Sequence, residues 1–293
     1  MRHVQRTLDV SERRACRVLG QARSTQRYES KRPDLDRLLV KRMEELGRKY
    51  PWYGYRRIWK LLVREGWRVN RKRVHRLWKE GGWQIRTKPK KKRRLGSSEN
   101  ASTLHRAQHR GHVWSYDFVF DRTEDGRQLK LLPILDEYTP ECLALEVDRS
   151  ITGEDVVDTL AYLFEVHGEP EFIRSDNGPE FVSEAVRSWL KTSGVGTLFI
   201  EPGSPWENPY SESFNSRLRD EFLDREIFTS VTEAEILAEQ HRVYHNLDRP
   251  HSSLGYLTPA EFATSLAEPV LLPRVAGEAL DSPEEGEAVL TLS

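Results

Sequence analysis

The stretch Val113-Trp114-Ser115-Tyr116-Asp117-Phe118-Val119-Phe120 decides the fold, because it reads as a β-strand that carries one acid among apolar residues. Successive side chains of a strand alternate between the two faces of a sheet, so Asp117 points away from Tyr116 and Phe118. A charged side chain in such surroundings is costly unless a partner compensates it. The stretch therefore predicts both a sheet core and an acid with a function.

Two further acids stand in equally informative surroundings. Asp176 lies in Ser175-Asp176-Asn177-Gly178-Pro179-Glu180-Phe181, where a short apolar stretch ends in a turn. The carboxyl end of a strand is where ligands meet α/β sheets. Glu212 lies in Asn208-Pro209-Tyr210-Ser211-Glu212-Ser213-Phe214-Asn215, where a helix is expected to begin, and 35 residues separate it from Asp176.

These three acids predict a metal site. Carboxylates about 4 Å apart repel by about 4 kcal/mol per pair at an effective dielectric of about 20, so only cations make their convergence reasonable. Ligands that are all oxygen favour Mg²⁺ or Mn²⁺ over zinc. Two such ions about 4 Å apart can activate a water or a sugar hydroxyl at a phosphodiester, which is the chemistry of phosphoryl transfer.

The order of elements around these acids predicts an α/β fold. Strand-like stretches occur at 113–120, 129–135 and 142–148, and Asp125-Gly126 is a probable hairpin turn between the first two. After them the sequence predicts a helix at 153–167 capped by Thr152, a strand at 171–175 that leads to Asp176, a helix at 179–193 and a strand at 196–200. Helices at 209–225 and 233–247 and a short helix from Pro259 complete the order. Three antiparallel strands followed by alternating helices and strands describe a layered fold of the ribonuclease-H kind.

Charge divides the 293 residues into two halves of opposite sign. Residues 1–98 carry 31 Lys and Arg against 9 Asp and Glu, a net charge of +22. Residues 99–293 carry 15 against 37, so the net charge of +0 is the sum of +22 and −22. Such asymmetry indicates a nucleic-acid-binding arm joined to a different domain.

The basic half predicts a helix-turn-helix region. Helices are expected within 10–30, at 34–48, at 55–65 and at 71–80, where Asn70 can cap the last helix and Gly81-Gly82 can end it. In that last helix Val74, Leu77 and Trp78 share an apolar face, as a helix lying in a DNA groove requires. The alternative for the cations of this helix is that they only face solvent. The candidate DNA contacts are these cations: Arg71, Lys72, Arg73, Arg76 and Lys79.

A linker is expected between the two halves. Residues 86–94 hold seven cations in nine positions, among them Lys90, Lys91 and Lys92, which can lie along phosphates. A Gly- and Ser-rich stretch follows at 96–103. The predicted domains are therefore a helix-turn-helix region at 1–85, a basic linker at 86–107, a catalytic core at 108–265 and an acidic tail at 266–293.

Other features exclude several classes of protein. Two cysteines, Cys16 and Cys142, make neither a disulfide framework nor a zinc module. No apolar stretch follows the basic N-terminus, and none approaches the length of a membrane span. A soluble cytoplasmic protein with no membrane partner is expected.

The motifs, taken in order, resemble a known family. They are Trp114-Ser115-Tyr116-Asp117-Phe118, Leu135-Asp136-Glu137-Tyr138-Thr139, the stretches around Asp176 and Glu212, Pro202-Gly203-Ser204-Pro205-Trp206-Glu207-Asn208, and Tyr244-His245-Asn246 through Arg249 to Tyr256. Residues 108–265 resemble the integrase-type catalytic core of bacterial insertion-sequence transposases of the D,D-35-E class, which is related to retroviral integrases. Residues 10–83 resemble the helix-turn-helix region that precedes this core in the group whose transposase is encoded by two overlapping frames.

The resemblance implies an activity and its residues. Asp117, Asp176 and Glu212 would be the catalytic acids that bind Mg²⁺ or Mn²⁺, and Arg219 would match the basic residue seven positions after the glutamate. The implied reaction is hydrolysis at the 3′ ends of the element and attack of each 3′-hydroxyl on another phosphodiester. The implied partners are double-stranded DNA, further copies of this chain in a homo-oligomer on DNA, and an upstream-frame product. Pro209 departs from the pattern, since this group usually has a small flexible residue there, and reduced loop motion is expected.

Some alternatives stay open. The rival functions are a non-catalytic DNA-binding regulator and a nuclease without strand transfer; the presence of all three acids argues against the regulator. Asp121 and Asp136 also lie on or beside strands. Asp121 could share the face of Asp117 as a further ligand, but a role in a turn is favoured for it. His241 and His245 have the spacing of zinc ligands, but residue 242 is Arg, so structural roles are favoured. His251 is expected either to contact DNA or to cap its own segment.

Overall fold

A computed structural model describes residues 5, 7–27, 33–83, 106–175, 183–199 and 208–267. Most of the predicted linker, including Lys90, Lys91 and Lys92, lies outside these ranges, and so does the tail from residue 268. Asp176 also lies outside them. None of the helices in the described ranges is long and apolar enough to cross a bilayer.

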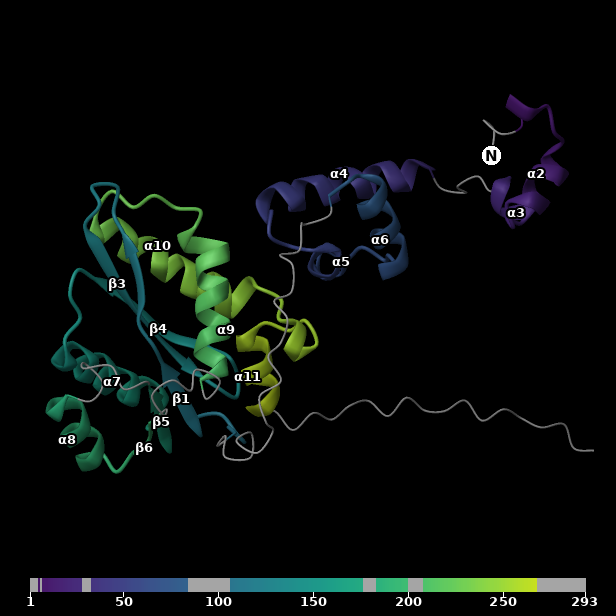
Figure 1. The fold of residues 1–293 in the computed structure, drawn as a ribbon. Helices are drawn as coiled ribbons and strands as arrows, with labels where there is room; N and C mark the ends of the chain where they lie inside the picture. The colour runs from purple at the N-terminus through teal and green to yellow at the C-terminus, as the bar shows by residue number, and fades with distance from the viewer. Residues whose placement is uncertain are drawn as a thin grey trace, which may run out of the picture.

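The basic half is helical, as predicted. Two short helices, α2 (Glu12–Val18) and α3 (Arg23–Gln26), precede α4 (Pro33–Lys49), α5 (Tyr55–Arg64) and α6 (Arg71–Glu80) (Figure 1). Asn70 caps α6, because its Oδ1 accepts the Lys72 backbone N–H at 2.8 Å. Helices α4 to α6 enclose a core of their own, built from Leu39, Met43, Leu46, Tyr53, Ile58, Leu62, Val74, Leu77 and Trp78.

The acidic half is built on one mixed sheet. Its strands are β1 (Val113–Tyr116), β2 (Val119–Arg122), β3 (Gln128–Asp136), β4 (Cys142–Asp148), β5 (Phe172–Ser175) and β6 (Gly196–Phe199). Strand β3 pairs antiparallel with β1, β2 and β4, whereas β1, β5 and β6 run parallel to one another. The predicted Asp125-Gly126 turn joins β2 to β3, and Gly126 has the positive φ of 82° that such a turn requires.

The stretch 113–120 is not one continuous strand. Strand β1 ends at Tyr116 and β2 begins at Val119, and both pair with the same partner, β3. Asp117 and Phe118 form the break between them. The prediction of an uninterrupted strand was therefore wrong at Asp117, where the ladder of hydrogen bonds is broken.

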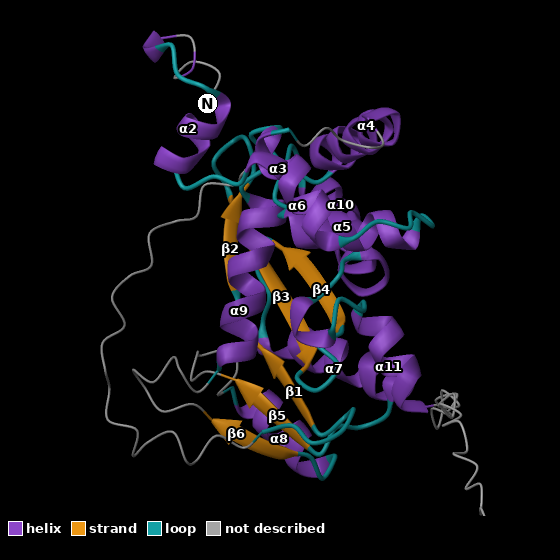
Figure 2. Ribbon diagram, turned by 90° about the vertical axis from the view of Figure 1, so that its right-hand side faces the viewer, coloured by secondary structure: helices purple, strands orange, loops and turns teal. Residues whose placement is uncertain are grey.

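Helices cover both faces of the sheet (Figure 2). On one face α7 (Gly153–His167) and α8 (Glu184–Thr192) pack against a cluster that includes Trp114 and Tyr116. On the other face lie α9 (Pro209–Leu218) and α10 (Val231–Val243), with Phe214, Leu218 and Phe222 buried against the sheet as their spacing predicts. Helix α11 (Pro259–Ala267) closes the described chain. The layered α/β prediction is confirmed, including the Thr152 cap of α7.

Two helices differ from the prediction at their carboxyl ends. Helix α9 passes at Leu218 into a π-helical turn, η3 (Arg219–Leu223), and α10 passes into another, η4 (Tyr244–Asp248). A π-helical turn shifts the helical phase. Leu223 is therefore buried, although regular α-helical spacing would place it on the same side of the helix as Glu212. Helix α10 also begins two residues earlier than predicted, capped by Ser230, which accepts the Glu233 N–H at 3.1 Å.

Candidate active site

Asp117 lies at the interruption between β1 and β2, on the side of the sheet that faces α9. Because Trp114 and Tyr116 pack toward α7 and α8, the alternation of the strand turns Ser115 and Asp117 to the opposite face. The Asp117 carboxylate is half-buried, and its Oδ2 accepts a hydrogen bond of 2.9 Å from the side-chain amide of Asn215 on α9. A helix and a strand break therefore meet at this acid.

Strand β5 ends beside Asp117. Strands β1 and β5 are parallel, with Trp114 opposite Ile173 and Ser115 opposite Arg174. Asp117 follows the last residue of β1, and Asp176 follows Ser175, the last residue of β5. The chain thus leaves two neighbouring parallel strands at the same edge of the sheet, with an acid next in the sequence each time.

Glu212 lies in the first turn of α9. It is exposed, and its backbone N–H bonds to the Asn208 carbonyl at 3.1 Å. Glu212 precedes Asn215 by three residues, so both side chains are on one side of the helix, the side that contacts Asp117. The amino end of a helix also stabilises an anion. Pro209 is the first residue of α9, where its missing N–H has no helical partner to lose.

The donors at this edge of the sheet suit a hard divalent cation. Asp117 and Glu212 offer carboxylate oxygens, and Asn215 has a buried Oδ1 with no hydrogen-bond partner among the described residues. Neither nitrogen nor sulfur ligands stand on this side of α9, because Glu212, Asn215, Ser216 and Arg219 occupy it. Such a donor set fits Mg²⁺ or Mn²⁺.

Arg219 fastens the same helix to the edge of the sheet. It is exposed, and its Nη2 donates to the Phe120 carbonyl on β2 at 3.0 Å. Since this bond uses one of the five N–H groups of the guanidinium, the others stay available to a phosphate.

A buried ion pair that the sequence did not suggest joins β5 to the turn after β3. Arg174 on β5 donates from Nε to Glu137 Oε1 at 2.9 Å, and the two side chains are 5% and 0% exposed. Arg174 lies opposite Ser115, which precedes Asp117 by two residues. Burial raises the pKa of Glu137 to about 7, although Arg174 acts to lower it. In the sequence only the motif Asp136-Glu137 drew attention to Glu137, and it did not identify Arg174 as the partner of Glu137.

The other candidate acids have structural roles. Asp136 is 1% exposed, and its two oxygens accept the backbone N–H groups of Gly111, Tyr138 and Thr139 at 2.7 to 3.0 Å. It therefore holds the turn after β3. Asp121 accepts the N–H of Arg122 at 2.8 Å. Neither residue joins Asp117 and Glu212.

The histidines near the carboxyl end of the core also have structural roles. His245 and His251 are each 3% exposed, and His245 Nε2 donates to the Pro140 carbonyl at 3.1 Å. His251 Nε2 accepts from Arg249 at 3.2 Å, so it forms part of the core rather than a DNA-facing surface. His241 stacks on Phe222, with ring centroids 4.9 Å apart.

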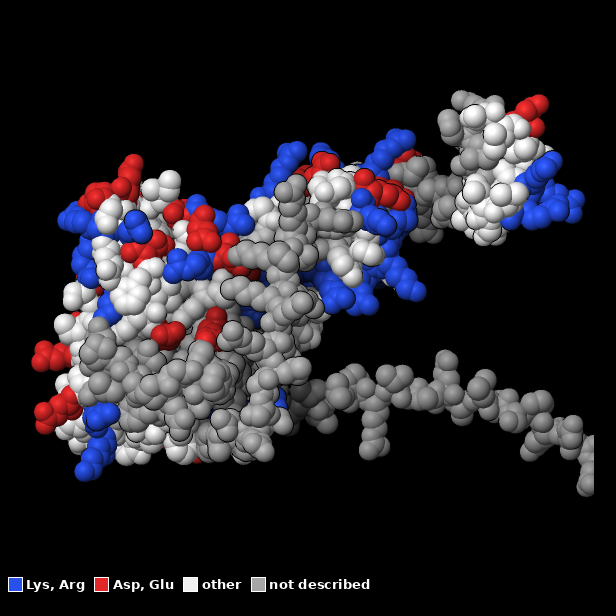
Figure 3. Space-filling view, in the orientation of Figure 1, with Lys and Arg blue, Asp and Glu red and all other residues white. Residues whose placement is uncertain are grey.

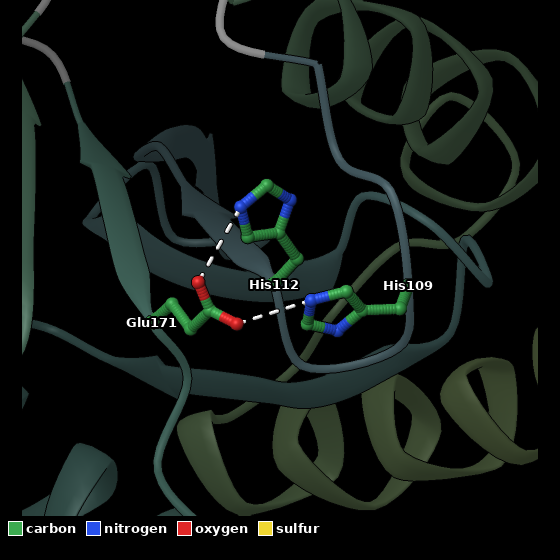
Figure 4. A group of neighbouring side chains, drawn as sticks. All are labelled: His109, His112 and Glu171. Atoms are coloured by element: carbon green, nitrogen blue, oxygen red, sulfur yellow. Dashed lines mark ion pairs between the residues drawn. The ribbon is translucent and has the colours of Figure 1, made fainter.

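A three-donor group at the opposite edge of the sheet is a poor metal site. His109 Nε2 lies 3.0 Å and His112 Nε2 3.6 Å from the Glu171 carboxylate (Figure 4). His112 Nδ1 accepts the Gln108 backbone N–H at 3.0 Å, which puts the proton of the neutral ring on Nε2. That nitrogen is therefore a donor to Glu171 and not a ligand. The group precedes β1 and β5, and the candidate acids follow them.

The cations of α6 divide into paired and unpaired residues. Arg73 and Arg76 form ion pairs with Asp36 at 2.7 and 3.2 Å. Arg71, Lys72 and Lys79 are exposed and form no ion pair with another described residue. At 100° per residue these three, together with His75, cover one arc of about 100° that borders the buried face on the side of Trp78. Lys and Arg crowd the surface around α4 to α6 in Figure 3.

A cleft of about 840 Å³ lies on the other side of α9. Its lining includes Tyr210, Ser213, Arg217, Glu137 and His251, but neither Asp117 nor Glu212. The candidate acids are thus not in this cleft, but on the open side of the helix.

Family models match both halves of the chain. A model described as "Integrase core domain" matches residues 107–205, and a second one with the same description matches residues 193–259. A model described as "HTH-like domain" matches residues 34–93. The two descriptions correspond to the sheet domain and to α4 to α6.

Relatives are found in bacterial insertion elements. An uncharacterized 31.7 kDa protein of insertion element IS407 from Burkholderia multivorans is 37% identical over 263 residues, which are 90% of this chain and 94% of the relative. An uncharacterized 39.2 kDa protein of IS476 from Xanthomonas euvesicatoria is 38% identical over 258 residues, or 87% and 73%. The transposase for IS904 from Lactococcus lactis is 28% identical over 220 residues, or 72% and 87%.

Retroviral integrases are among the similar solved structures. The simian T-cell lymphotropic virus intasome in complex with the PP2A regulatory subunit B56 gamma has a chain at TM-score 0.48 and 14% identity, over 86% of this chain and 80% of that chain. The HTLV-2 integrase catalytic core domain in complex with magnesium gives a TM-score of 0.42 at 13% identity, over 54% and 99%. The relative from IS407 is matched almost to its ends, and the integrase-core models extend from residue 107 to residue 259, so the chain belongs to the integrase-core family of bacterial insertion elements.

Proposed function

We propose that the protein is a DNA transposase that cleaves the 3′ ends of an insertion sequence and joins them to target DNA by phosphoryl transfer. Its family includes proteins named as transposases of insertion elements, such as that of IS904. The combination of an integrase core with a basic helical domain supports a DNA substrate.

The hydrogen bond from Asn215 to Asp117 is the observation that carries this proposal. It joins α9 to the break between β1 and β2, with Glu212 one turn away on the same side of the helix. Strands β1 and β5 are paired in parallel, and they end one residue before Asp117 and one residue before Asp176. Both observations support a site formed by Asp117, Asp176 and Glu212, which we propose as the catalytic acids.

The acids would hold two Mg²⁺ or Mn²⁺ ions. When bound, such ions supply charge stabilisation and a more acidic nucleophile at the phosphodiester. The protein's own part is positioning: Asn215 donates to one Asp117 oxygen, and the helix amino end supports the negative charge of Glu212. Arg219, bonded to the Phe120 carbonyl, would direct its remaining N–H groups to the DNA backbone.

The two chemical steps use the same site. Water first attacks the phosphodiester at each 3′ end of the element, and the bond to the flanking DNA breaks to release a 3′-hydroxyl. That hydroxyl then attacks a phosphodiester of the target strand, and the bond to the former neighbouring nucleotide breaks. Each step exchanges one P–O bond for another, so no covalent enzyme intermediate and no external energy source are needed.

We propose that α6 contacts DNA through the arc of Arg71, Lys72 and Lys79, whereas Arg73 and Arg76, which the sequence also predicted as contacts, are paired with Asp36. The basic linker residues Lys90, Lys91 and Lys92 would follow the phosphates. Two element ends must be held together during transposition, so we also propose a homo-oligomer on DNA. An upstream-frame product would take part in binding the ends.

A strand-transfer assay in Mg²⁺ with Glu212→Gln tests the proposal. The amide has nearly the shape of the carboxylate but binds cations poorly, so we expect both end cleavage and joining to fall on the order of 10³-fold with DNA binding unchanged. Glu235→Gln is the matched control, because Glu235 is an exposed helical glutamate on α10. It should retain wild-type rates.

The rival functions give different results in the same assay. Cleavage without joined products in the wild type would indicate a nuclease. Binding without cleavage in the wild type would indicate a regulator. Unchanged rates in Glu212→Gln would remove Glu212 from the site and leave the family assignment intact.

A further inference from the structure

Glu221 is a buried carboxylate that the proposed chemistry does not use. It lies in the π-helical turn η3, and its side chain is 7% exposed. Arg249, which is 1% exposed, donates to both of its oxygens, from Nε at 2.7 Å and from Nη2 at 2.6 Å. Burial alone would raise the pKa of Glu221, but the hydrogen bonds from Arg249 outweigh it and the pKa is lowered. Glu221 is therefore a charged group in the core.

A second guanidinium reaches the same carboxylate from the DNA-binding half. Arg57 on α5 donates from Nη1 to Glu221 Oε1 at 3.2 Å, and its side chain is 20% exposed. The Arg57 guanidinium also lies over the Tyr53 ring, 4.9 Å from the centroid. One buried acid thus holds one arginine of the core and one of the helix-turn-helix domain.

Aromatic contacts extend this junction. The hydroxyls of Tyr53 and Tyr244 are hydrogen-bonded to each other, and Tyr53 is 1% exposed. Tyr50 stacks on Tyr53 and on Tyr244, with centroids 4.9 and 6.0 Å apart. Tyr244 is the first residue of the second π-helical turn, η4. The DNA-binding half therefore contacts the core at both of its π-helical turns, and Figure 2 shows α5 on the α10 side of the sheet domain.

Further contacts surround this centre. Arg64 at the end of α5 pairs with Glu261 on α11 at 2.5 Å. Arg225, just after η3, lies 4.7 Å above the Trp52 ring. Exposed pairs of this kind add little stability alone, but they fix the orientation in which the buried contacts are made.

The helix that carries Glu212 runs directly into this junction. Helix α9 continues without a break into η3, because Leu218 and Arg219 both keep right-handed helical dihedrals. Glu221 follows Glu212 by nine residues along this one element. π-helical turns are local irregularities that are frequent at functional sites, and a buried charge on one fixes its register.

We propose that Arg57, Glu221 and Arg249 form an interdomain latch, through which the position of α4 to α6 against the core determines the position of α9 and therefore of Glu212. The mechanical part of this proposal, that the latch determines the position of α9, concerns only the contacts between the domains. The consequence for catalysis rests on the proposed function of Glu212. Arg57, Glu221 and Arg249 are positioning residues, since none of them lies at the candidate acids.

Hydrogen exchange on the full-length protein without DNA tests the mechanical part. Arg57→Ala removes the guanidinium from Glu221, and we expect the amides of α9 and η3 to exchange about 2- to 30-fold faster, the range found for such couplings. Arg57→Lys keeps a positive charge near the carboxylate and should restore part of the protection. The control is Arg37→Ala, which removes the same charge from an exposed pair with Asp34 at 3.4 Å; it should leave exchange in α9 unchanged.

The catalytic part is tested by strand transfer at saturating DNA in Mg²⁺. Arg57→Ala should lower the rate by a similar factor at an unchanged half-saturating DNA concentration, because positioning is lost and binding is not. If Arg57→Ala does not fold, Tyr244→Phe removes only the hydroxyl bonded to Tyr53 and should show the same pattern more weakly.

Two results would overturn the latch. One is wild-type exchange in α9 and η3 for both Arg57→Ala and Tyr244→Phe. The other is faster exchange in α9 with an unchanged rate of strand transfer, which would make the junction purely structural. Loss of activity in Glu212→Gln is independent of either result, so a failed latch and a failed active site are distinguishable.

Discussion

Asp117 shows at the scale of one residue how an acid in a strand break is held by another element. The strand ladder stops at Tyr116 and resumes at Val119, and the acid in the gap is held by an amide from another element, Asn215. A neutral amide donor orients a carboxylate without neutralising it. The hydrogen bond from Asn215 therefore orients Asp117 and adds no positive charge beside it.

Asn215→Asp should make the protein depend on divalent cations for stability. The new carboxylate would face Asp117 at hydrogen-bond distance, and two such charges repel by about 6 kcal/mol at an effective dielectric of about 20. We expect a lower melting temperature in EDTA than for the wild type, and a larger rise when Mg²⁺ is added. Thermal denaturation followed by circular dichroism measures both.

The comparison is with Ser188→Asp, which adds the same charge at an exposed position of α8, on the opposite face of the sheet. It should show no additional response to Mg²⁺. Equal responses of Asn215→Asp and Ser188→Asp would contradict the idea that Asn215 faces a cation-binding carboxylate.

At the scale of an element, α6 separates cations that support the fold from cations that face solvent. Asp36 on α4 binds Arg73 and Arg76, which fixes the angle between the two helices. Arg71, Lys72 and Lys79 are left for a ligand. Composition predicted a basic helix, but only the packing of α4 on α6 determined which of its charges are already paired.

The salt dependence of DNA binding should distinguish these two sets. Each phosphate contact contributes about one unit to the slope of log K against log salt concentration. We expect Lys72→Ala and Lys79→Ala each to reduce the slope by about one, whereas Arg76→Ala, whose guanidinium pairs with Asp36 and Glu80, changes it little. Fluorescence anisotropy with an end-sequence duplex at several salt concentrations gives the slopes. A flat salt response of the wild type would refute the DNA arm.

The π-helical turns show what periodicity cannot predict in an element. Predicted helices at 209–225 and 233–247 correspond to α9 with η3 and to α10 with η4. A π-helical turn changes the angular phase of the helix but needs no particular composition. The apolar pattern of the sequence therefore predicts one continuous helix. The result is that Glu221, which reads as a surface acid, is buried against Arg249.

At the scale of the molecule, the junction between the domains collects buried histidines. Burial lowers the pKa of His241 to about 4 and that of His251 to about 2, and it lowers the pKa of His245 well below its ordinary value. Nearby Arg249 adds to the effect in each case. The folded protein therefore keeps three imidazoles neutral at pH values where the unfolded chain protonates them.

The protein should lose stability as the pH falls below about 6.5. In that range the unfolded state binds more protons than the folded state, so each histidine with a lowered pKa costs about 1.4 kcal/mol per pH unit until its folded pKa is reached. Urea denaturation between pH 7 and pH 5 measures the slope. His251→Asn should reduce it by roughly one histidine's share. An equal slope in His251→Asn and the wild type would contradict this account.

The amino-acid sequence by itself determined the α/β order, the two oppositely charged halves, and the acids Asp117 and Glu212 in their strand and helix settings. These features are local, because periodicity, turn residues and charge act over a few neighbouring positions. Asp176 is a prediction of the same kind, which the described residues do not include.

Only the tertiary structure decided which polar residues found partners. Asn215 with Asp117, Arg174 with Glu137, and Arg57 and Arg249 with Glu221 join residues between 28 and 164 positions apart. Such pairs depend on how whole elements pack against one another. Residue types that are usually exposed are buried there and held in place by a charged or polar partner. That is why the sequence indicated the acids of the site, whereas the structure revealed how the DNA-binding half is attached to the helix that carries one of them.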